Sequence, residues 1–451
     1  MHKAPNLVSL LFLSLLAAAL GCSESSGTAG AGGAGGTGGG AGVGGTGGGT
    51  GGIGGGGGAP GSGGTGGMEM LGNCHPSTPS RLSDWNLFSN IRDQVPQEGV
   101  IPFEVTSALF TDYALKHRFV TLTDGGQINY FPDTTRWQSP VGTIYVKTFA
   151  YPPNDADPNS DGKEQLIETR LLVHYDAEDE RSGCSGEDSC WDVHAYVYNE
   201  DMTDAVCMRT GAVVSVTFTD EDEQQRTIDD YAVPANSACY QCHGAFPGSR
   251  TLGPSTGMLN RGNNYLGASV NNQIDQLYAL GMLDQEPQPV DERPTYVDPV
   301  NDTEAGLHER ARSWFDPNCS HCHAEDGEAA GTGVLLDYVS MDPVGADRLT
   351  YRRWGVCRTA SSVGAKVDCI MPNDIVPGKS AQSLMPCRVK SVIVGEMMAP
   401  IGRSTYHVQG HALVAEWIDA LPELFTDPPM PTDCDIGGTG GAGGGGGNGG
   451  S

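Results

Sequence analysis

Two short stretches of the chain place two cysteines and a histidine at the same spacing. Cys239-Tyr-Gln-Cys242-His243 and Cys319-Ser-His-Cys322-His323 both have the pattern C-x-x-C-H, and the sequence contains no third copy. In this pattern the two thiols can add to the vinyl groups of haem, and the adjacent imidazole can bind the iron. The spacing therefore predicts two covalently bound haem c groups, with His243 and His323 as the proximal ligands of their irons.

Zinc sites and redox dithiols also use paired cysteines, and the sequence argues against both. A structural zinc site usually takes a second Cys or His pair roughly 12–20 residues further on. The next cysteine after Cys242 is Cys319, and the next after Cys322 is Cys357, so neither pair has a close partner. A thioredoxin-like dithiol needs a βαβ setting, which neither flank predicts. His321, between the cysteines of the second motif, is predicted to face solvent rather than to bind iron.

The start of the chain, residues 1–21, is typical of a signal peptide for export. The apolar run from Leu7 to Leu20 is too short for a comfortable membrane span. Ala19-Leu-Gly-Cys22 resembles the lipobox of bacterial lipoproteins, which predicts Cys22 as a lipid anchor. An ordinary signal peptide followed by a stray cysteine is the alternative. We expect an exported lipoprotein, facing the periplasm or in the outer membrane, that reaches the membrane only through this anchor.

Glycine-rich segments flank the part of the chain that can fold. Residues 22–67 begin with the anchor cysteine and residues 436–451 end the chain, and both segments consist mainly of glycine. Such segments cannot bury a core, so they predict a disordered linker and a disordered tail.

The formal net charge is −29, from 55 acidic and 26 basic residues. A strongly acidic protein is repelled by nucleic acid and by anionic lipid, so neither is expected as a direct partner. The charge is compatible with basic redox partner proteins and is also a common solubility feature of exported proteins.

The remaining cysteines predict disulfides. One of the 13 cysteines takes the lipid and four hold haem, which leaves an even number in an exported chain. Cys184–Cys190 is a plausible local bridge, Cys357–Cys369 is a second candidate, and Cys74–Cys434 could clamp the ends of the folded region. The eight remaining cysteines are Cys74, Cys184, Cys190, Cys207, Cys357, Cys369, Cys387 and Cys434.

The pattern over residues 74–233 is mostly that of strands. Segments rich in β-branched and aromatic residues, several alternating at period two, are separated by turn residues. They predict an antiparallel, sandwich-like β domain, preceded by a short amphipathic helix over residues 83–92. The expected strands are 143–151, 166–174, 191–198 and 213–219.

Beyond Pro234 the pattern becomes helical, so the fold class is expected to be α+β. Residues 234–295 form a first haem-binding segment, and residues 300–425 form a cytochrome c domain that holds the second haem. The order of a helix, a C-x-x-C-H motif, loops, a methionine and a last amphipathic helix is that of a class I cytochrome c. Helices are expected over residues 270–280, 303–315 and 411–421.

A methionine in the loop before the last helix is the expected distal ligand of the second haem. Met398 is the preferred residue and Met397 its substitute; methionines are also ordinary core residues. For the first haem the distal ligand is less defined by the sequence. Met258 is the candidate that we name, and the other candidates are Met282, His117, His174 and His194, of which His194 is expected on the solvent side of its strand.

The chain resembles a family of exported bacterial dihaem c-type cytochromes with an N-terminal β-rich region. The similar stretches include Arg81 to Phe88, Thr106 to Leu115, Pro140 to Pro152, Asn318 to His323 and Met397 to Arg403. The resemblance implies two covalent haem c groups and electron transfer. The chain departs from the family at Met397-Met-Ala-Pro, where proline tends to follow the second methionine directly.

The predicted function is that of a carrier that passes electrons between redox partners through two covalently bound haems, rather than an enzyme. One alternative is a peroxidase-like dihaem oxidoreductase, with the first haem as active site and the second as electron relay. Another is a β-domain adhesion or binding module with accessory haems. Asp155 to Gly162 spaces oxygen ligands as calcium loops do, but the twelfth position is Leu166 rather than glutamate, so an acidic turn is the simpler interpretation.

Overall fold

The computed structural model of the protein describes residues 74–181, 184, 189–220, 223–244, 248–263, 272–360, 367–431 and 434. The expected signal peptide, the anchor at Cys22, and the glycine-rich segments 22–67 and 436–451 lie outside the described residues.

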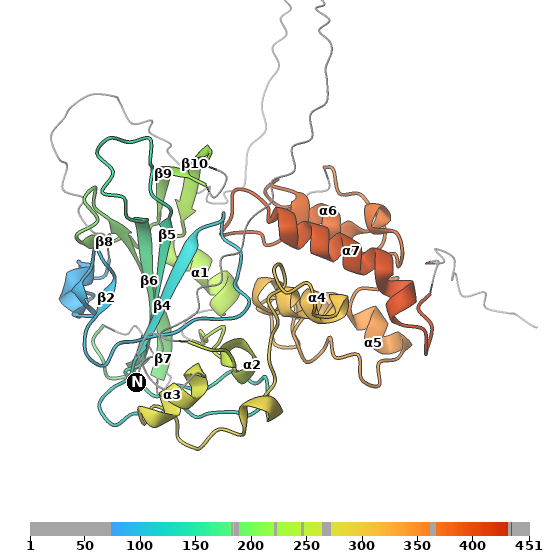
Figure 1. Cartoon of the computed structure of the whole chain (residues 1–451), viewed down its shortest axis with the longest axis horizontal. Helices are drawn as coiled ribbons and strands as arrows, with labels where there is room; N and C mark the ends of the chain where they lie inside the picture. Colours follow the sequence, from blue (N-terminus) through green and yellow to red (C-terminus); the bar gives the residue numbers. More distant parts are fainter. Residues whose placement is uncertain are drawn as a thin grey trace, which may run out of the picture. The chain divides into compact units, whose positions relative to one another are not determined.

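The N-terminal part is built on a six-stranded antiparallel sheet whose strands follow one another in chain order (Figure 1). Three of the expected strands, 143–151, 166–174 and 191–198, form its centre, which confirms the strand pattern of the sequence. The strands are β3 (Ile101–Pro102), β4 (Leu115–Thr121), β5 (Ile144–Tyr151), β6 (Gln165–Asp176), β7 (Ser189–Tyr198) and β8 (Ala205–Cys207).

A two-stranded antiparallel ribbon, β9 (Ala212–Thr219) and β10 (Gln225–Val233), covers part of one face of this sheet. Phe218 and Tyr231 of the ribbon pack against Phe149 and Tyr151 of β5 in one buried apolar cluster. The β-rich, antiparallel prediction is confirmed. Among the described residues the second layer consists of these two strands, so the arrangement is a partial sandwich.

The helix expected over residues 83–92 is wrong for most of its length. A single 3-10 turn spans Leu82–Trp85 and ends at Asn86, whose φ of 51° is left-handed. The chain then forms β1 (Phe88–Asn90), which pairs with β2 (Val95–Pro96). Leu82, Leu87 and Phe88 are the buried apolar residues here, and their spacing does not form one helical stripe.

The expected helices are present in shortened or extended form. Residues 270–280 correspond to α3, 303–315 to α4 and 411–421 to α7. Helices α4 and α7 pack on each other around Phe315 and Trp417, both fully buried. The helices are α1 (Asn236–His243), α2 (Thr256–Leu259), α3 (Gln273–Ala279), α4 (Leu307–Phe315), α5 (Arg348–Arg353), α6 (Leu384–Lys390) and α7 (Val408–Leu424), with 3-10 turns at Val290–Glu292, Ala330–Thr332 and Ser380–Gln382.

All eight cysteines outside the two motifs and the N-terminus lie in four disulfides. Cys184–Cys190 pairs as expected, whereas the pairs Cys357–Cys369 and Cys74–Cys434 are wrong. Two cysteines close in sequence need not be partners, because the backbone in between decides which side chains meet. The other three disulfides are Cys74–Cys207, Cys357–Cys434 and Cys369–Cys387.

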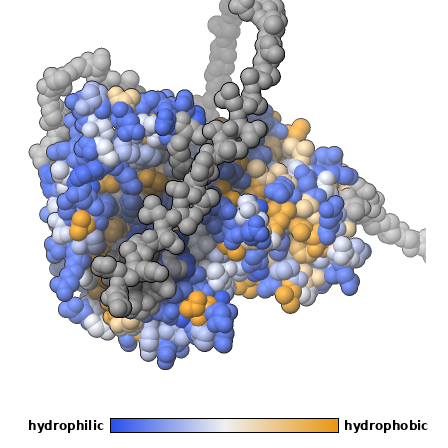
Figure 2. Space-filling model, viewed as in Figure 1, coloured by the Kyte–Doolittle hydropathy of each residue, from blue (hydrophilic) through white to orange (hydrophobic). Residues whose placement is uncertain are grey.

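The surface differs between the two parts of the fold. In the view of Figure 2 the strand-rich part is mostly hydrophilic, and more hydrophobic side chains lie over the helices α4 to α7. Val344, Val394 and Ile370 are exposed in this helical part of the chain. Among the described residues, none of the helices combines the length and the apolar character that crossing a membrane requires.

Candidate functional site

The first C-x-x-C-H motif forms the end of helix α1. The helix is fixed to β7 at two points: the Asn236 amide donates to the Val193 carbonyl at 2.6 Å, and the Tyr240 hydroxyl donates to Asp192 at 2.8 Å. It ends at Gly244, whose φ of 87° is a conformation that residues with a side chain rarely adopt. Cys239 is buried, and its Sγ lies 3.7 Å from the Ala235 carbonyl oxygen.

The second motif follows directly on helix α4. A π-helical turn over Asp316–Ser320 continues the helix and carries Cys319, and the next turn carries Cys322 and His323. Asn318 fixes the segment to the N-terminal part, because its side-chain oxygen accepts a hydrogen bond of 2.8 Å from the Phe110 amide. Gly327 packs so closely on the Cys322 carbonyl that an added Cβ would lie 2.2 Å from its oxygen.

The two motif histidines are oriented in the same way. Nδ1 of His243 lies 2.8 Å from the Arg250 carbonyl oxygen, and Nδ1 of His323 lies 3.3 Å from the Val334 carbonyl oxygen. Because a carbonyl oxygen only accepts, Nδ1 carries the proton and Nε2 keeps its lone pair. Burial lowers the pKa of His243 to about 4 and also lowers the pKa of His323, so burial favours the neutral form of both rings. This is the state in which imidazole binds a metal.

Both motifs line one cavity of about 680 Å³. Cys242 reaches it from α1, and Cys319, Cys322 and His323 reach it from the second motif. Its volume lies in the range of about 300–1,000 Å³ that is usual for small-molecule and cofactor sites. The other lining side chains are mainly apolar and include Leu109, Phe110, Trp314, Phe315, Val334, Leu336, Leu384, Val389 and Ile401.

The four motif cysteines are the only described cysteines without a disulfide. The Cys242 thiol hydrogen-bonds to Cys322, which raises the pKa of Cys242 and lowers that of Cys322. Burial raises the pKa of Cys239 to about 11 and raises that of Cys319 as well. Three of these four thiols, those of Cys242, Cys319 and Cys322, line the cavity, whereas Cys239 and His243 of the first motif are not among its lining residues.

Met398 lines the same cavity, and its backbone is held on both sides. Its amide donates to the Arg388 carbonyl at 2.9 Å, and its carbonyl accepts a hydrogen bond of 2.8 Å from the Arg403 guanidinium. Met397, the substitute candidate, is buried and is not among the residues that line the cavity.

The methionine candidates for the first haem lie in apolar clusters away from this lining. Met258 is buried beside Tyr296 and Tyr338, and Met282 belongs to a different buried cluster. The structure thus does not bring Met258 together with the first motif in the shared cavity.

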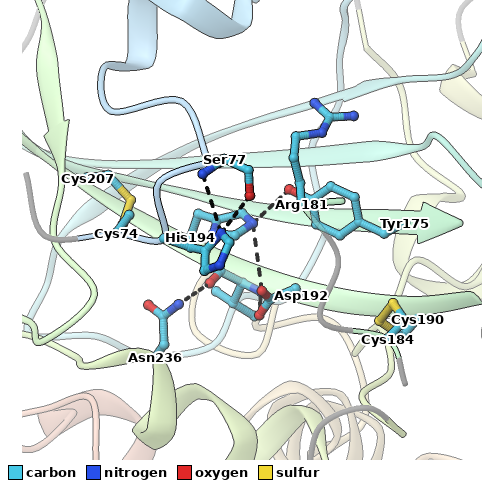
Figure 3. Close-up of polar contacts among 12 residues, drawn as sticks. Cys74, Ser77, Tyr175, Arg181, Cys184, Cys190, Asp192, His194, Cys207 and Asn236 are labelled. Atoms are coloured by element: carbon cyan, nitrogen blue, oxygen red, sulfur yellow. Dashed lines mark hydrogen bonds and ion pairs between the residues drawn. A yellow bond between two sulfur atoms is a disulfide. The ribbon is translucent and has the colours of Figure 1, made fainter. Parts of the chain in front are cut away.

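The three histidines of the strands have other polar contacts. His117 pairs with Glu164 at 2.5 Å, and the ring of His174 stacks on Trp191 with ring centres 4.3 Å apart. His194 was expected to face solvent and is instead buried. Figure 3 shows it between Tyr175, whose hydroxyl lies 2.9 Å from Nε2, and Asp192 at 3.9 Å, at the edge of a second cavity of about 410 Å³.

The structure also bears on two further predictions, the solvent-facing position of His321 and the calcium-like spacing of Asp155 to Gly162. His321 is only 4% exposed and lines the shared cavity, so its predicted solvent-facing position is wrong. In the segment Asp155 to Gly162, for which an acidic turn is the simpler interpretation, Asp161 accepts hydrogen bonds from Arg92. Among the described residues there is no group of three or more His, Cys, Asp or Glu side chains placed to hold a metal ion.

His407 also lines the shared cavity, although nothing in the sequence singles it out. Its ring stacks on Phe110 with ring centres 4.8 Å apart, and its Nδ1 accepts a hydrogen bond of 3.1 Å from the Trp314 indole. Burial lowers the pKa of His407 to about 4. No sequence signal could have found this residue, because Phe110 and His407 are almost 300 positions apart and meet only in the fold.

Comparison of the chain with protein-family models, with curated proteins and with solved structures gives no match.

Proposed function

We propose that the chain is an exported dihaem c-type cytochrome that carries electrons between redox partner proteins. The observation that supports this most directly is the state of the cysteines: among those described, the four left without a disulfide are the four of the two C-x-x-C-H motifs. Bound haem supplies a one-electron ferric/ferrous couple. The chain supplies thiols for attachment, oriented imidazoles and a largely apolar cavity.

Each motif residue has a separate role in this proposal. Cys239 and Cys242 attach one haem, and Cys319 and Cys322 attach the other. His243 and His323 bind the irons through Nε2, because Nδ1 donates to a backbone carbonyl in both. Met398 is proposed as the distal ligand of the second haem. A thioether is a soft ligand that raises the potential of a haem.

The export and anchoring of the protein are part of the same proposal. A lipid at Cys22 would keep the folded part near a membrane, with residues 22–67 as a tether, and a haem c protein of this kind would face the periplasm. Redox partners would then be proteins of that compartment. Neither nucleic acid nor a direct lipid-binding surface is proposed.

The test counts covalent haem per chain in protein made by cells that can attach haem c. Acid–acetone extraction followed by the pyridine haemochrome spectrum should give two haems for the unmodified chain. Changing both cysteines of one motif to serine should leave one haem, and changing all four should leave none. The Cys184→Ser/Cys190→Ser variant is the matched control and should keep two. A chain without covalent haem would refute the proposal.

The alternative of a dihaem oxidoreductase differs at the sixth position of the first iron. A side chain at that position gives a low-spin spectrum that does not respond to cyanide or peroxide, as expected for electron transfer alone. A spectral response confined to one haem, and lost in the Cys239→Ser/Cys242→Ser variant, would favour the enzyme.

A further inference from the structure

Basic side chains form a row across three neighbouring strands of the six-stranded sheet. Arg118 of β4 pairs with Lys147 of β5, and Lys147 pairs in turn with Arg170 of β6. Residues directly opposite one another in antiparallel strands point to the same face. Lys116, two positions before Arg118, points to that face too. We call these four residues the basic row.

An aromatic ring lies among these charges. Phe149 is fully buried, and its ring centre lies 4.3 Å from the Arg170 guanidinium, 5.1 Å from the Lys147 ammonium and 6.0 Å from the Lys116 ammonium. The negative face of an aromatic ring attracts cations. The ring has no net charge, however, so it holds the cations without neutralising them.

Glu168, an acidic neighbour of the row, already has hydrogen-bond partners. Glu168 has no exposed surface and accepts hydrogen bonds from Arg170 at 2.8 and 2.5 Å. The Tyr231 hydroxyl donates to the same carboxylate at 2.7 Å. Glu168 and Arg170 thus form a closed pair, and the next cation along the row, Lys147, is outside it.

Lys147 has no hydrogen-bond or ion-pair partner among the described residues. The polar contact that the structure gives its ammonium group is the cation–π contact with the Phe149 ring. Burial, followed by the three other cations of the basic row, holds the pKa of Lys147 well below its usual value. Burial and the nearby guanidinium groups lower the pKa of Lys116 to about 7. Such a cluster is stabilised by an anion placed among its members.

The basic row lies close to the first motif. Arg170 lies opposite Ala195 of β7. Helix α1, which carries the motif, is fixed to the same strand two positions away by the hydrogen bond from Asn236 to the Val193 carbonyl. In keeping with this, the charges of Arg170 and Glu168 act on the pKa of Cys239, and that of Lys147 acts on the pKa of His243. We propose that the basic row binds a carboxylate or a similarly small oxyanion beside the first C-x-x-C-H motif. The anion has two possible sources: a propionate of haem attached there, which rests on the proposed function, or a free anion from solution, which does not.

The test compares Lys147→Met with Lys163→Met, a matched change of an exposed lysine that pairs with Asp93 at the surface. Each change is made in the full chain and in the Cys239→Ser/Cys242→Ser chain, which cannot attach the first haem. Acetate and sulfate are the probes. Anion binding is measured by calorimetry and by thermal unfolding, and the potential of the first haem is measured by spectroelectrochemistry.

A propionate on the row gives one pattern of results. The haem-loaded chain does not bind acetate or sulfate. The chain without the first haem binds both anions, and the Lys147→Met change abolishes this binding. In the haem-loaded chain Lys147→Met lowers the potential of the first haem, because a nearby cation favours the ferrous state. The expected change in the ferric-to-ferrous ratio is about tenfold, or 59 mV for one electron.

A free anion gives another pattern: the haem-loaded chain itself binds acetate or sulfate, and Lys147→Met weakens the binding at least about tenfold. The proposal is overturned if neither chain binds the probes and Lys147→Met leaves the potential unchanged. Lys147→Arg, which keeps the cation, should retain the response and guards against misfolding of the methionine variant. The number of haems per chain tests the proposed function separately from the anion site. A chain with no haem would refute the proposed function, whereas anion titration of that chain would still show whether the basic row binds an anion.

Discussion

Asp112, in the loop before β4, fixes the segment that follows Met398. Its carboxylate is 2% exposed and accepts two hydrogen bonds of 2.8 Å from the Ser404 amide, one of 3.0 Å from the Ser404 hydroxyl and one of 2.9 Å from the Thr405 amide. These groups are almost 300 positions from Asp112 in the chain. The carboxylate therefore joins the strand-rich part to the loop that carries the proposed iron ligand.

Asp112→Asn should loosen this junction at nearly constant side-chain volume. An amide offers one acceptor oxygen, so one of the three donors loses its acceptor, and the two that keep one now donate to a neutral oxygen instead of a charged one. Hydrogen bonds to a charged group contribute roughly 1.5–3 kcal/mol each, and partial relaxation lowers the sum. We expect a loss of about 2–4 kcal/mol, which accelerates hydrogen exchange at Ser404 and Thr405 by roughly 30- to 1,000-fold.

Hydrogen exchange followed by mass spectrometry of peptides covering residues 399–407 measures the local effect, and urea unfolding measures the global one. Asp124→Asn is the matched control, because Asp124 is exposed on a turn; its effect should stay within about 0.5 kcal/mol. If Asp112→Asn changes neither exchange nor unfolding beyond this control, then the carboxylate does not stabilise the junction and the reasoning above is wrong.

Three further predictions follow from the same structure. Met398→Ala should abolish the ferric sulfur-to-iron charge-transfer band and lower the potential of the second haem, whereas Met397→Ala should leave both unchanged; the reverse result would move the ligand by one position. Thiol titration of the denatured, unreduced protein should detect no free thiol among the eight cysteines assigned to disulfides, and several reactive thiols would contradict the pairing. The pKa of Lys116 is about 7 in the folded state and near 10.5 in the unfolded state. Between these pH values the folded state binds fewer protons than the unfolded state, so Lys116 makes the protein more stable as pH rises from 7 to 9. Lys116→Met should flatten that rise in urea unfolding, Lys163→Met should not, and equal slopes in both variants would refute the assignment.

The strands and the helices around the two motifs could be predicted because their signals are local. Alternation of β-branched and aromatic residues identified β5, β6 and β7, and the apolar period of α7 identified the last helix. The helix predicted over residues 83–92 was wrong because the left-handed conformation of Asn86 ends the 3-10 turn after four residues. The backbone conformation at one residue decided the outcome there.

The sequence predicts the motif residues of the candidate site but not the cavity that surrounds them. The motif residues carry their spacing in the sequence, but the shared cavity depends on contacts between distant segments. Phe110 meets Asn318 and His407 only once both parts have folded, so neither the burial of His321 nor the lining role of His407 has a local signature. The basic row is equally invisible in the sequence, since its register across β4, β5 and β6 is set by pairing.

The four disulfides divide the described chain into two covalently closed regions. Cys74–Cys207 encloses the N-terminal region together with the small Cys184–Cys190 loop, and Cys357–Cys434 encloses Cys369–Cys387 at the other end. A protease cut inside either region would release no fragment until reductant is added. A cut between residues 243 and 319 would instead separate the two C-x-x-C-H motifs in denaturant without reductant. Non-reducing gel electrophoresis after limited proteolysis would therefore yield two pieces, each with its own motif, so that the spectrum of each attached group could be recorded from the natural chain without any substitution.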